Sequence, residues 1–318
     1  MISRELVADQ LHHTLETVDL NLPGTCMRGK VRDSWHRDGR RLIVTSDRVS
    51  AYDVVLTTIP FKGQVLNQMA AFWFEATRDI VPNHVVSLPA PNAMIVRDVE
   101  PLKVEMIVRG YLTGTTSTSI WTHYKNGGRN FCGNPLPDGL VKDQALPHAL
   151  LTPSTKAEQG EHDESVSAEE IVKRSLVSRD IMDQLSRISL ALFARGTEIA
   201  ARQGIILVDT KYEFGLLDGK VILIDEIHTP DSSRFWYADS YQQRLKEGAE
   251  QRRIDKDVMR TWLAERGFTG DGPVPPITDE LRIEAALKYI EAYEAITGST
   301  FDAEPGPVGP RLARITDY

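Results

Sequence analysis

The chain has 318 residues, of which 41% are hydrophobic and 26% are charged, and its glycine and proline counts are 22 and 17. These values lie near the average of soluble globular proteins and exclude collagen-like, low-complexity and wholly disordered chains. The formal charge of −8 argues against a general binder of duplex DNA or of anionic membranes, because both partners require a basic protein surface.

Cysteine content and hydropathy predict a cytoplasmic protein. Cys26 and Cys132 are the only cysteines, which is too few for a disulfide framework or a cysteine-rich zinc site and is typical of a reducing compartment. No apolar run approaches the roughly 18 residues that a membrane span needs, and the first residues lack the apolar core of a signal peptide. We therefore expect neither nucleic acid nor a membrane among its partners.

The first half of the chain is predicted to be a β-rich α+β unit. Apolar spacing predicts a helix over residues 3–19. Two strands are expected to meet in a tight turn at residues 36–40, where Asp38-Gly39 supplies the positive φ angles. A helix over residues 64–79 precedes short apolar runs that are broken by Pro and Asn.

The second half begins with a long polar segment, residues 125–166, of the kind that is usually functional or disordered. Ser167 and Glu170 form a capping box that opens a helix extending to about residue 203. Residues 205–227 contain an antiparallel hairpin that turns at Asp218-Gly219. The remainder, from residue 239, is predicted to be mostly helical.

The hairpin carries the most informative charges. Because side chains alternate along a strand, Asp209, Lys211 and Glu213 share one face, and the partner strand places Asp225 beside them. On an exposed sheet these would be solvated ion pairs of little energetic value. The neighbouring runs 205–208 and 221–224 are nearly all apolar, however, which predicts buried strands. Buried carboxylates need partners or a cation, so Glu213 and Asp225 are candidates for a Mg²⁺–nucleotide site.

Two further groups could bind anions. Gly29 lets the backbone approach a polyphosphate, and Lys30 can meet its charge, although a solvated turn would show the same residues. Arginine forks bind carboxylate and phosphate, and Arg109 and Arg234 both lie beside glycine or hydroxyl residues; surface salt bridges are the alternative. The histidines show no metal-binding spacing, and no nucleophile motif is present.

Six strings in this order resemble one family: GKVRD, SDRVSAYD, VEMIVRGYLTGT, TPSTKAEQGEHD, VDTKYEFG and IDEIHTPDSSRFW. The chain is similar, from about Gly24 to Gly298, to the phosphoribosylaminoimidazole-succinocarboxamide (SAICAR) synthases, ATP-dependent ligases of purine biosynthesis. The segment 125–166 resembles the longer, fungal-type form. The resemblance implies an α+β, two-lobed fold. Residues 1–110 would form an antiparallel-sheet nucleotide-binding lobe. Residues 111–318 would form an α/β, ATP-grasp-like lobe with the metal hairpin 205–227 and C-terminal helices, and ATP would be clamped between the lobes.

The implied reaction is a carbon–nitrogen ligation. ATP activates the carboxylate of carboxyaminoimidazole ribotide (CAIR), through an acyl phosphate, and the amine of L-aspartate displaces phosphate to give SAICAR, with ADP as the second product. The expected cofactors are ATP and Mg²⁺, and the expected partners are small molecules, with monomer and homo-oligomer both open. Such a mechanism needs no protein nucleophile, because phosphoryl transfer depends mainly on positioning and electrostatic stabilisation.

The resemblance also implies residue roles. Lys30 and Arg32 would lie over the ATP phosphates and Glu105 near the adenine, Glu213 and Asp225 would hold Mg²⁺, and Lys211 would stabilise charge beside them. Arg109, Thr115, Asp209 and Arg234 would surround the ribotide, with Lys256 and Arg260 near its 5′-phosphate; Thr115 stands where serine is expected. Lys30, Lys211 and Asp209 are the catalytic candidates, with Asp209 as the group that takes the proton from aspartate. Ser46, Asp47, Arg48, Ser50 and Asp53 are expected at the wall of the site, and Lys156 near the aspartate.

Two other functions could use an ATP site of this kind. A kinase-like phosphotransferase would also need a glycine turn and a metal-binding acid, but the HRDxxxxN loop is absent. A regulatory nucleotide-binding module would leave the ribotide arginines unexplained. Dependence of ADP release on L-aspartate separates the ligase from both.

Overall fold

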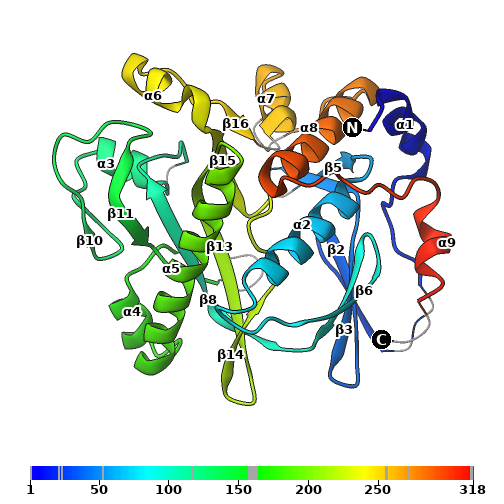
Figure 1. The fold of residues 1–318 in the computed structure, drawn as a ribbon, viewed down its shortest axis with the longest axis horizontal. Helices are drawn as coiled ribbons and strands as arrows, with labels where there is room; N and C mark the ends of the chain where they lie inside the picture. The colour runs from blue at the N-terminus through cyan, green and yellow to red at the C-terminus, as the bar shows by residue number, and fades with distance from the viewer. Residues whose placement is uncertain are drawn as a thin grey trace. The chain divides into compact units, whose positions relative to one another are not determined.

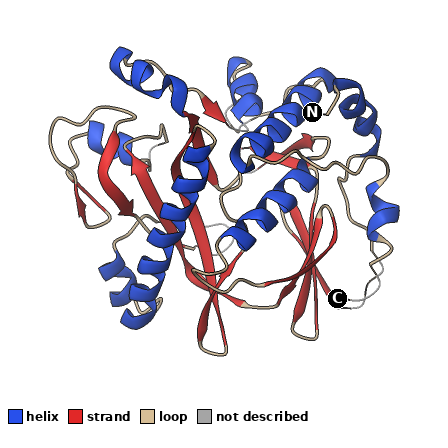
Figure 2. Ribbon diagram, viewed as in Figure 1, coloured by secondary structure: helices blue, strands red, loops and turns tan. Residues whose placement is uncertain are grey.

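The structure, a computed structural model, describes residues 2–20, 22, 24–51, 54–116, 118–156, 164–254, 257–268, 270, 272–315 and 318. It consists of helices and antiparallel sheets, which confirms the α+β class (Figures 1 and 2). The chain divides into two compact units. Unit 1 comprises Met1–Phe72, His84–Asp98 and Asp255–Tyr318, and unit 2 comprises Trp73–Asn83 and Val99–Ile254.

The boundary expected at residue 110 divides the chain differently from these units. Strand β8 (Glu100–Tyr111) pairs with strands of unit 2, and the C-terminal helices belong to unit 1. The assignment of β8 to unit 2 and of the C-terminal helices to unit 1 depends on contacts between distant segments. A local sequence pattern does not show such contacts.

Unit 1 is built on a five-stranded antiparallel sheet with the order β1-β2-β3-β7-β6 and on a separate β4–β5 pair. Its strands are β1 (Thr25–Arg28), β2 (Arg32–Arg37), β3 (Arg40–Thr45), β4 (Arg48–Ala51), β5 (Val54–Thr58), β6 (Val85–Ala90) and β7 (Ala93–Arg97). The predicted turn between β2 and β3 is confirmed. Asp38 and Gly39 have φ angles of 50° and 74°, both positive as this two-residue hairpin requires.

The helices of unit 1 come from both ends of the chain. They are α1 (Arg4–Asp9), η1 (Gln10–His13), α7 (Asp257–Glu265), α8 (Asp279–Thr297) and α9 (Val308–Leu312), and α2 (Lys62–Ala76) starts in this unit. The helix expected over 3–19 is therefore too long. Ser3 caps its start by accepting from the Leu6 amide, but the backbone is extended by Thr14, and Leu15 and Val18 pack into the core from an extended segment.

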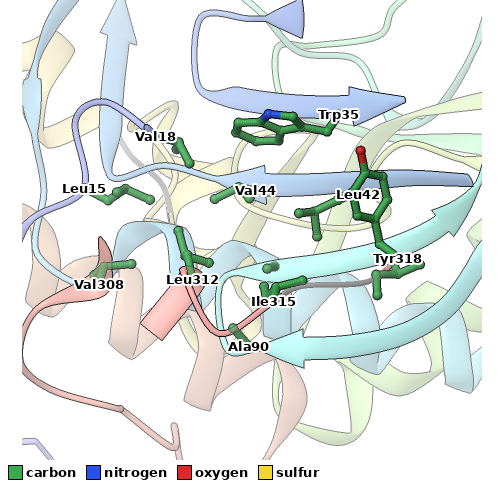
Figure 3. Packing of buried hydrophobic residues seen from close by; sticks show 12 residues of the cluster. Leu15, Val18, Trp35, Leu42, Val44, Ala90, Val308, Leu312, Ile315 and Tyr318 are labelled. Carbon is green, nitrogen blue, oxygen red and sulfur yellow. The ribbon is translucent and has the colours of Figure 1, made fainter. Parts of the chain in front are cut away.

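The C-terminal segment completes the core of unit 1. Figure 3 shows Leu312 beneath Val44 of the sheet and Tyr318 beside Leu42 and Trp35, and Ile315 belongs to the same cluster. Val308, Leu15 and Val18 belong to the same cluster of buried residues. The two ends of the chain thus bury the same sheet, and burial of this apolar surface is the main favourable term for their order.

Unit 2 is built on a seven-stranded antiparallel sheet. The path β11-β8-β13-β15-β16 forms its body, β12 pairs with β8, and β14 pairs with β13. Its strands are β8, β11 (Ala145–Leu151), β12 (Ser154–Thr155), β13 (Ile205–Leu217), β14 (Lys220–Ile224), β15 (Ser233–Tyr237) and β16 (Arg253–Ile254), and β9 (Asn130–Phe131) pairs separately with β10 (Asn134–Pro135). The expected β13–β14 hairpin is confirmed, with φ angles of 50° at Asp218 and 75° at Gly219.

The helices of unit 2 are α3 (Ile120–Lys125), α4 (Ala168–Lys173), α5 (Arg179–Arg202) and α6 (Ala238–Glu247). Ser167 caps α4 as predicted, by accepting from the Glu170 amide. The single helix expected from there to residue 203 is wrong, because Ser175 adopts a φ of 58° and Ser178 caps a new helix. Helix α5 packs along β13 and β8 (Figure 1).

The segment 125–166 is largely ordered where the structure describes it. It contributes β9 to β12 and buries Phe131, Leu136, Leu146 and Leu150 in one cluster with Leu112. Residues 157–163, most of the string KAEQGEHD, lie outside the described residues. Among the described residues, no helix is both long and apolar enough to cross a membrane.

Truncating Leu312 to alanine is expected to lower the free energy of unfolding by about 2–5 kcal/mol. Its side chain is fully buried against the sheet, so the substitution removes apolar contacts and leaves a cavity. Urea unfolding measures the change. Leu190→Ala is the matched control, because Leu190 also lies on a helix but is 39% exposed. Equal losses in the two variants would contradict the packing of the C-terminal segment.

Candidate active site

Three neighbouring strands of unit 2 place charged side chains on one face of the sheet. We call the set formed by Glu105 and Arg109 on β8, Asp209, Lys211 and Glu213 on β13 and Arg234 on β15 the charged face. The antiparallel register sets Arg109 and Arg234 opposite Asp209, and Glu105 opposite Glu213. The predicted alternation along β13 is therefore realised, and two adjacent strands extend it.

Lys211 lies between two carboxylates. Its Nζ atom is 2.7 Å from Glu105 Oε1 and 2.7 Å from Glu213 Oε1. Both glutamates are buried, at 7% and 8% exposure, so each needs a cation or hydrogen-bond donors to remain ionised. Burial alone would lower the pKa of Lys211, but the charges of Glu213, Glu105 and Asp225 outweigh it and raise the pKa. Lys211 is thus a permanent positive charge at neutral pH.

A second ammonium reaches the same carboxylate. Lys156 Nζ pairs with Glu213 Oε2, while Lys211 holds Oε1. Lys156 follows β12, which pairs with β8 beside Glu105. The residue that the sequence suggested for aspartate binding therefore lies at the charged face, directly before residues 157–163.

Asp209 is held between two guanidinium groups. Arg109 Nη1 and Arg234 Nη1 each lie 3.3 Å from Asp209 Oδ2, and Arg109 Nε donates to Thr152 Oγ1 at 2.9 Å. Burial lowers the pKa of Arg109, with Arg234 acting in the same direction and Asp209 against both. The side chain of Arg234 is 43% exposed, so this arginine presents its remaining donors to solvent or to a ligand.

Gly114 permits a close approach at the end of β8. It has a φ of 104°, and a Cβ there would lie 2.5 Å from Ser119 Cβ and 3.2 Å from Arg234 Nη1. Thr113 donates to Asp143 Oδ1 at 2.5 Å, which fixes the same turn. Thr115, predicted at the ribotide, is exposed at the surface of this turn.

The reverse side of β13 is closed by a buried histidine. His228 is fully buried, with Nε2 3.3 Å from Tyr212 Oη and its ring 4.7 Å from that of Trp73. Burial lowers its pKa to about 3, so the imidazole is neutral. A Cβ on Gly196 of α5 would lie 2.7 Å from the His228 ring. His228 thereby holds the segment between Asp225 and Arg234 against the helix.

Asp225 follows β14 and is half-buried, with a φ of 66°. Its charge contributes to the raised pKa of Lys211, so it belongs to the same electrostatic cluster as Glu213. No group of three or more His, Cys, Asp or Glu side chains suitable for a metal occurs among the described residues. The hard oxygen donors Glu213 and Asp225 nevertheless fit Mg²⁺, which commonly takes one or two carboxylates and completes its shell with phosphates and water.

The glycine turn of unit 1 connects β1 to β2. The Gly29 amide donates to the Arg32 carbonyl at 2.8 Å, and a Cβ on Gly29 would lie 2.7 Å from that oxygen, so the turn requires glycine. Lys30 is exposed and Arg32 is half-buried. Lys30 therefore lies accessible on a tight turn, and Arg32 begins β2 directly after that turn.

The segment expected at the wall of the site is buried and supports the backbone. Asp47 accepts from the amides of Leu15 at 2.7 Å and Gly63 at 2.8 Å. Burial raises the pKa of Asp47 to about 6 in spite of these hydrogen bonds and of the charges of Lys62 and Arg311. Ser50 is half-buried, and Asp53 lies outside the described residues.

The side chains of two residues predicted at the ribotide are not described by the structure. Lys256 lies outside the described residues, and so does the side chain of Arg260, whose backbone is part of α7. Sequence reasoning missed Thr152, Asp143 and His228. Thr152 and Asp143 contact residues that are distant in the sequence, so no local pattern indicates their roles. His228 stands in the string IHTPDS, and nothing in that string indicates that the histidine is buried.

The charged face defines a class of site: cations and carboxylates arranged on a buried sheet, of the kind that binds and activates small anionic molecules. The SAICAR synthetase family model matches residues 25–274. The putative phosphoribosylaminoimidazole-succinocarboxamide synthase 2 of Agrobacterium fabrum is 51% identical, over 91% of this chain and 92% of that protein. The phosphoribosylaminoimidazole-succinocarboxamide synthase of Bacteroides thetaiotaomicron is 48% identical, over 91% and 93%.

Solved structures agree with these matches. SAICAR synthase from Saccharomyces cerevisiae, complexed with SAICAR, has a TM-score of 0.79 at 33% identity and covers 91% of this chain and 100% of that chain. A SAICAR synthetase in complex with ADP has a TM-score of 0.63 at 25% identity, over 88% and 100%. The chain belongs to the SAICAR synthetase family. Membership confirms the predicted resemblance, the fold and the assignment as a ligase of purine biosynthesis.

Replacing Lys211 with methionine is expected to lower the free energy of unfolding at pH 7 by about 3–5 kcal/mol, because two buried carboxylates lose the cation between them. Glu105→Gln added to Lys211→Met restores part of the stability. Lys173→Met is the control, since Lys173 is 80% exposed beside Glu170; a loss no larger than in this variant contradicts the assignment.

The stability contributed by Asp47 is expected to fall as the pH rises. Its carboxyl group has a pKa of about 6 in the folded state, above the ordinary value of 3.8, so the folded state keeps its proton to a higher pH than the unfolded chain does. The stabilisation is complete below pH 4 and is lost as the pH passes 6. The difference in unfolding free energy between wild type and Asp47→Asn should therefore decrease by about 1–3 kcal/mol from pH 4 to pH 7. A difference that increases over this range would contradict the raised pKa of Asp47 in the folded state.

Proposed function

We propose that this ligase joins L-aspartate to the carboxylate of CAIR, with ATP converted to ADP and phosphate through an acyl phosphate. The observation that carries the proposal is Lys211, which lies between buried Glu105 and Glu213 on the same face as the Arg109–Asp209–Arg234 group. The complexes of the two similar structures, one with SAICAR and one with ADP, support the product and the nucleotide.

Mg²⁺ would be held by Glu213 and Asp225 and would supply charge neutralisation at the phosphates of ATP. The two oxygens of Glu213 pair with the ammonium groups of Lys211 and Lys156. Both ammonium groups are positioned to stabilise negative charge that develops on a phosphoryl group. The site therefore balances its carboxylates with cations of its own chain, and an anionic ligand would compete for those cations.

The ribotide side of the site is proposed at Arg109 and Arg234. Buried Arg109 has Thr152 and Asp209 as fixed partners, so it orients Asp209 rather than reaching outward. Arg234 is the more exposed arginine and is the better candidate for direct contact with an anionic substrate. Asp209 pairs with both arginines, which supports a role in holding them; its role as proton acceptor stays a prediction.

The remaining roles follow the same chemistry. Lys30 and Arg32, on the glycine turn of unit 1, are proposed to bind the ATP phosphates. Glu105 is proposed near the adenine on the basis of the resemblance, although here its carboxylate pairs with Lys211. Thr115, Lys256 and Arg260 stay predicted ligands of the ribotide. The cytoplasmic location is likewise a prediction.

Glu213→Gln is expected to reduce kcat at least 100-fold, because the substitution removes one proposed Mg²⁺ ligand and the partner of both lysines. ADP release is measured with ATP, Mg²⁺ and CAIR, with and without L-aspartate. Glu170→Gln is the matched control, as Glu170 pairs with Arg174 on the surface of α4.

Aspartate dependence decides between the functions. Turnover that requires both CAIR and L-aspartate, and that collapses in Glu213→Gln but not in Glu170→Gln, supports the ligase. ADP release that is indifferent to aspartate would overturn it in favour of a phosphotransferase. An unchanged Glu213→Gln variant would overturn the assignment of the charged face.

A further inference from the structure

Arg48 makes a concentrated set of contacts in unit 1. Its guanidinium donates to the carbonyl oxygens of Gly29 at 3.0 Å, Lys30 at 2.9 Å and Glu16, and to the carboxylate of Asp33 at 2.6 Å and 3.4 Å. These contacts use Nε and both donors of each Nη atom. Because a guanidinium has five N–H donors in total, Arg48 has none left for a phosphate. Arg48 cannot therefore act on a nucleotide directly.

Ser46 continues the same set of contacts along the turn. Its amide and its hydroxyl donate to the Val31 carbonyl at 2.9 Å and 2.7 Å, and its Oγ also accepts from the Arg48 amide at 3.4 Å. The carbonyls of Gly29, Lys30 and Val31 are thus all held by one short segment, Ser46 to Arg48. Ser46 is fully buried and the Arg48 side chain is 11% exposed, so water cannot easily replace these contacts.

Holding these carbonyls also orients the other half of each peptide group. A trans peptide is planar, with its C=O and N–H on opposite sides, and the described residues include no cis peptide. With the Gly29 and Lys30 oxygens directed at the guanidinium, the amide N–H groups of Lys30 and Val31 are directed away from it. Successive amides that face one way form a concave donor site for an anion.

The charge of Arg48 is neutralised within the protein. Asp33, at 1% exposure, forms an ion pair with the guanidinium, so the pair has no net charge. Lys30, by contrast, is a cation on the exposed side of the turn. The arrangement separates two tasks: the buried pair fixes the backbone, and the exposed ammonium meets the ligand. Such preorganisation improves affinity because less ordering remains to be done on binding.

We propose that Arg48 and Ser46 are positioning residues that set the Gly29–Val31 turn for nucleotide phosphates, the turn amides acting with Lys30 Nζ. This inference rests on the proposed function, in which the turn binds ATP. It assigns the SDR string a structural role behind the site, in place of a position on its wall.

The test uses Arg48→Lys, because an ammonium has three donors and lacks the planar fork that reaches three carbonyls and a carboxylate. The Kd of ADP with Mg²⁺ is measured by calorimetry and the KM values of ATP, L-aspartate and CAIR by turnover. We expect the ADP Kd and the ATP KM to rise about tenfold or more, with the KM of aspartate within twofold of wild type. Ser46→Ala should raise the ADP Kd by a smaller factor, about two- to fivefold.

Arg41→Lys is the matched control. Arg41 lies on β3 of the same sheet and pairs with Asp98 at 2.7 Å, but it contacts no carbonyl of the turn. It should leave the ADP Kd unchanged. Hydrogen exchange of residues 29–32 gives a readout independent of nucleotide, and it should accelerate in Arg48→Lys and not in Arg41→Lys.

The outcomes separate the inference from the proposed function. If wild type binds ADP, Lys30→Met weakens it, and Arg48→Lys and Ser46→Ala do not, the positioning role is wrong while the ligase assignment stands. If wild type binds no ADP, the proposed function and the inference both fail. If Arg48→Lys does not fold, Ser46→Ala decides alone, and a wild-type ADP Kd in that variant overturns the inference. Weakening as large in Arg41→Lys as in Arg48→Lys would also overturn it.

Discussion

The cost of burying carboxylates determines how unit 2 is arranged. Glu105 and Glu213 are opposite each other in the β8–β13 register, and both side chains are buried. Two ionised carboxylates in this position would repel each other, and each would lose its hydration. Lys211 resolves both problems by lying between them, and Lys156 adds a second cation. This balance of charges determines which groups a ligand can bind. An anionic ligand can pair with the lysines, and a divalent cation can pair with the carboxylates.

The same principle appears in unit 1 with a different result. Asp33 and Arg48 form a buried pair whose charges cancel, and every donor of the guanidinium is used within the protein. A buried pair of this kind contributes little net stability, because desolvation offsets the attraction. Its value lies in geometry, since it holds the carbonyls of the turn in one orientation. The charged side chains of the charged face can still bind a ligand. The Arg48–Asp33 pair behind the turn cannot, because its donors are used within the protein.

Local patterns in the sequence predicted the elements whose stability is local. Asp38-Gly39 and Asp218-Gly219 specified their turns, and Ser167 specified the start of α4, because each depends on a few neighbouring residues. Alternation along β13 placed Asp209, Lys211 and Glu213 on one face. The end of α4 was missed since Ser175 adopts a left-handed conformation that its residue type does not demand. The C-terminal residues that complete the core of unit 1 were equally unpredictable, because their partner strands lie more than 200 residues away.

The site shows the same division between local and distant contacts. Lys211 and Glu213 are two residues apart, so their proximity could be read from strand geometry, whereas Glu105 and Lys156 join them only through the register of β8 and β12. Motif resemblance supplied Glu105 as a site residue but not its partner. The resemblance also placed the SDR string at the wall of the site, because the string matches a motif of the family. All five donors of Arg48 are directed at the protein's own backbone and carboxylate, which supports the proposal that Arg48 positions the Gly29–Val31 turn from behind.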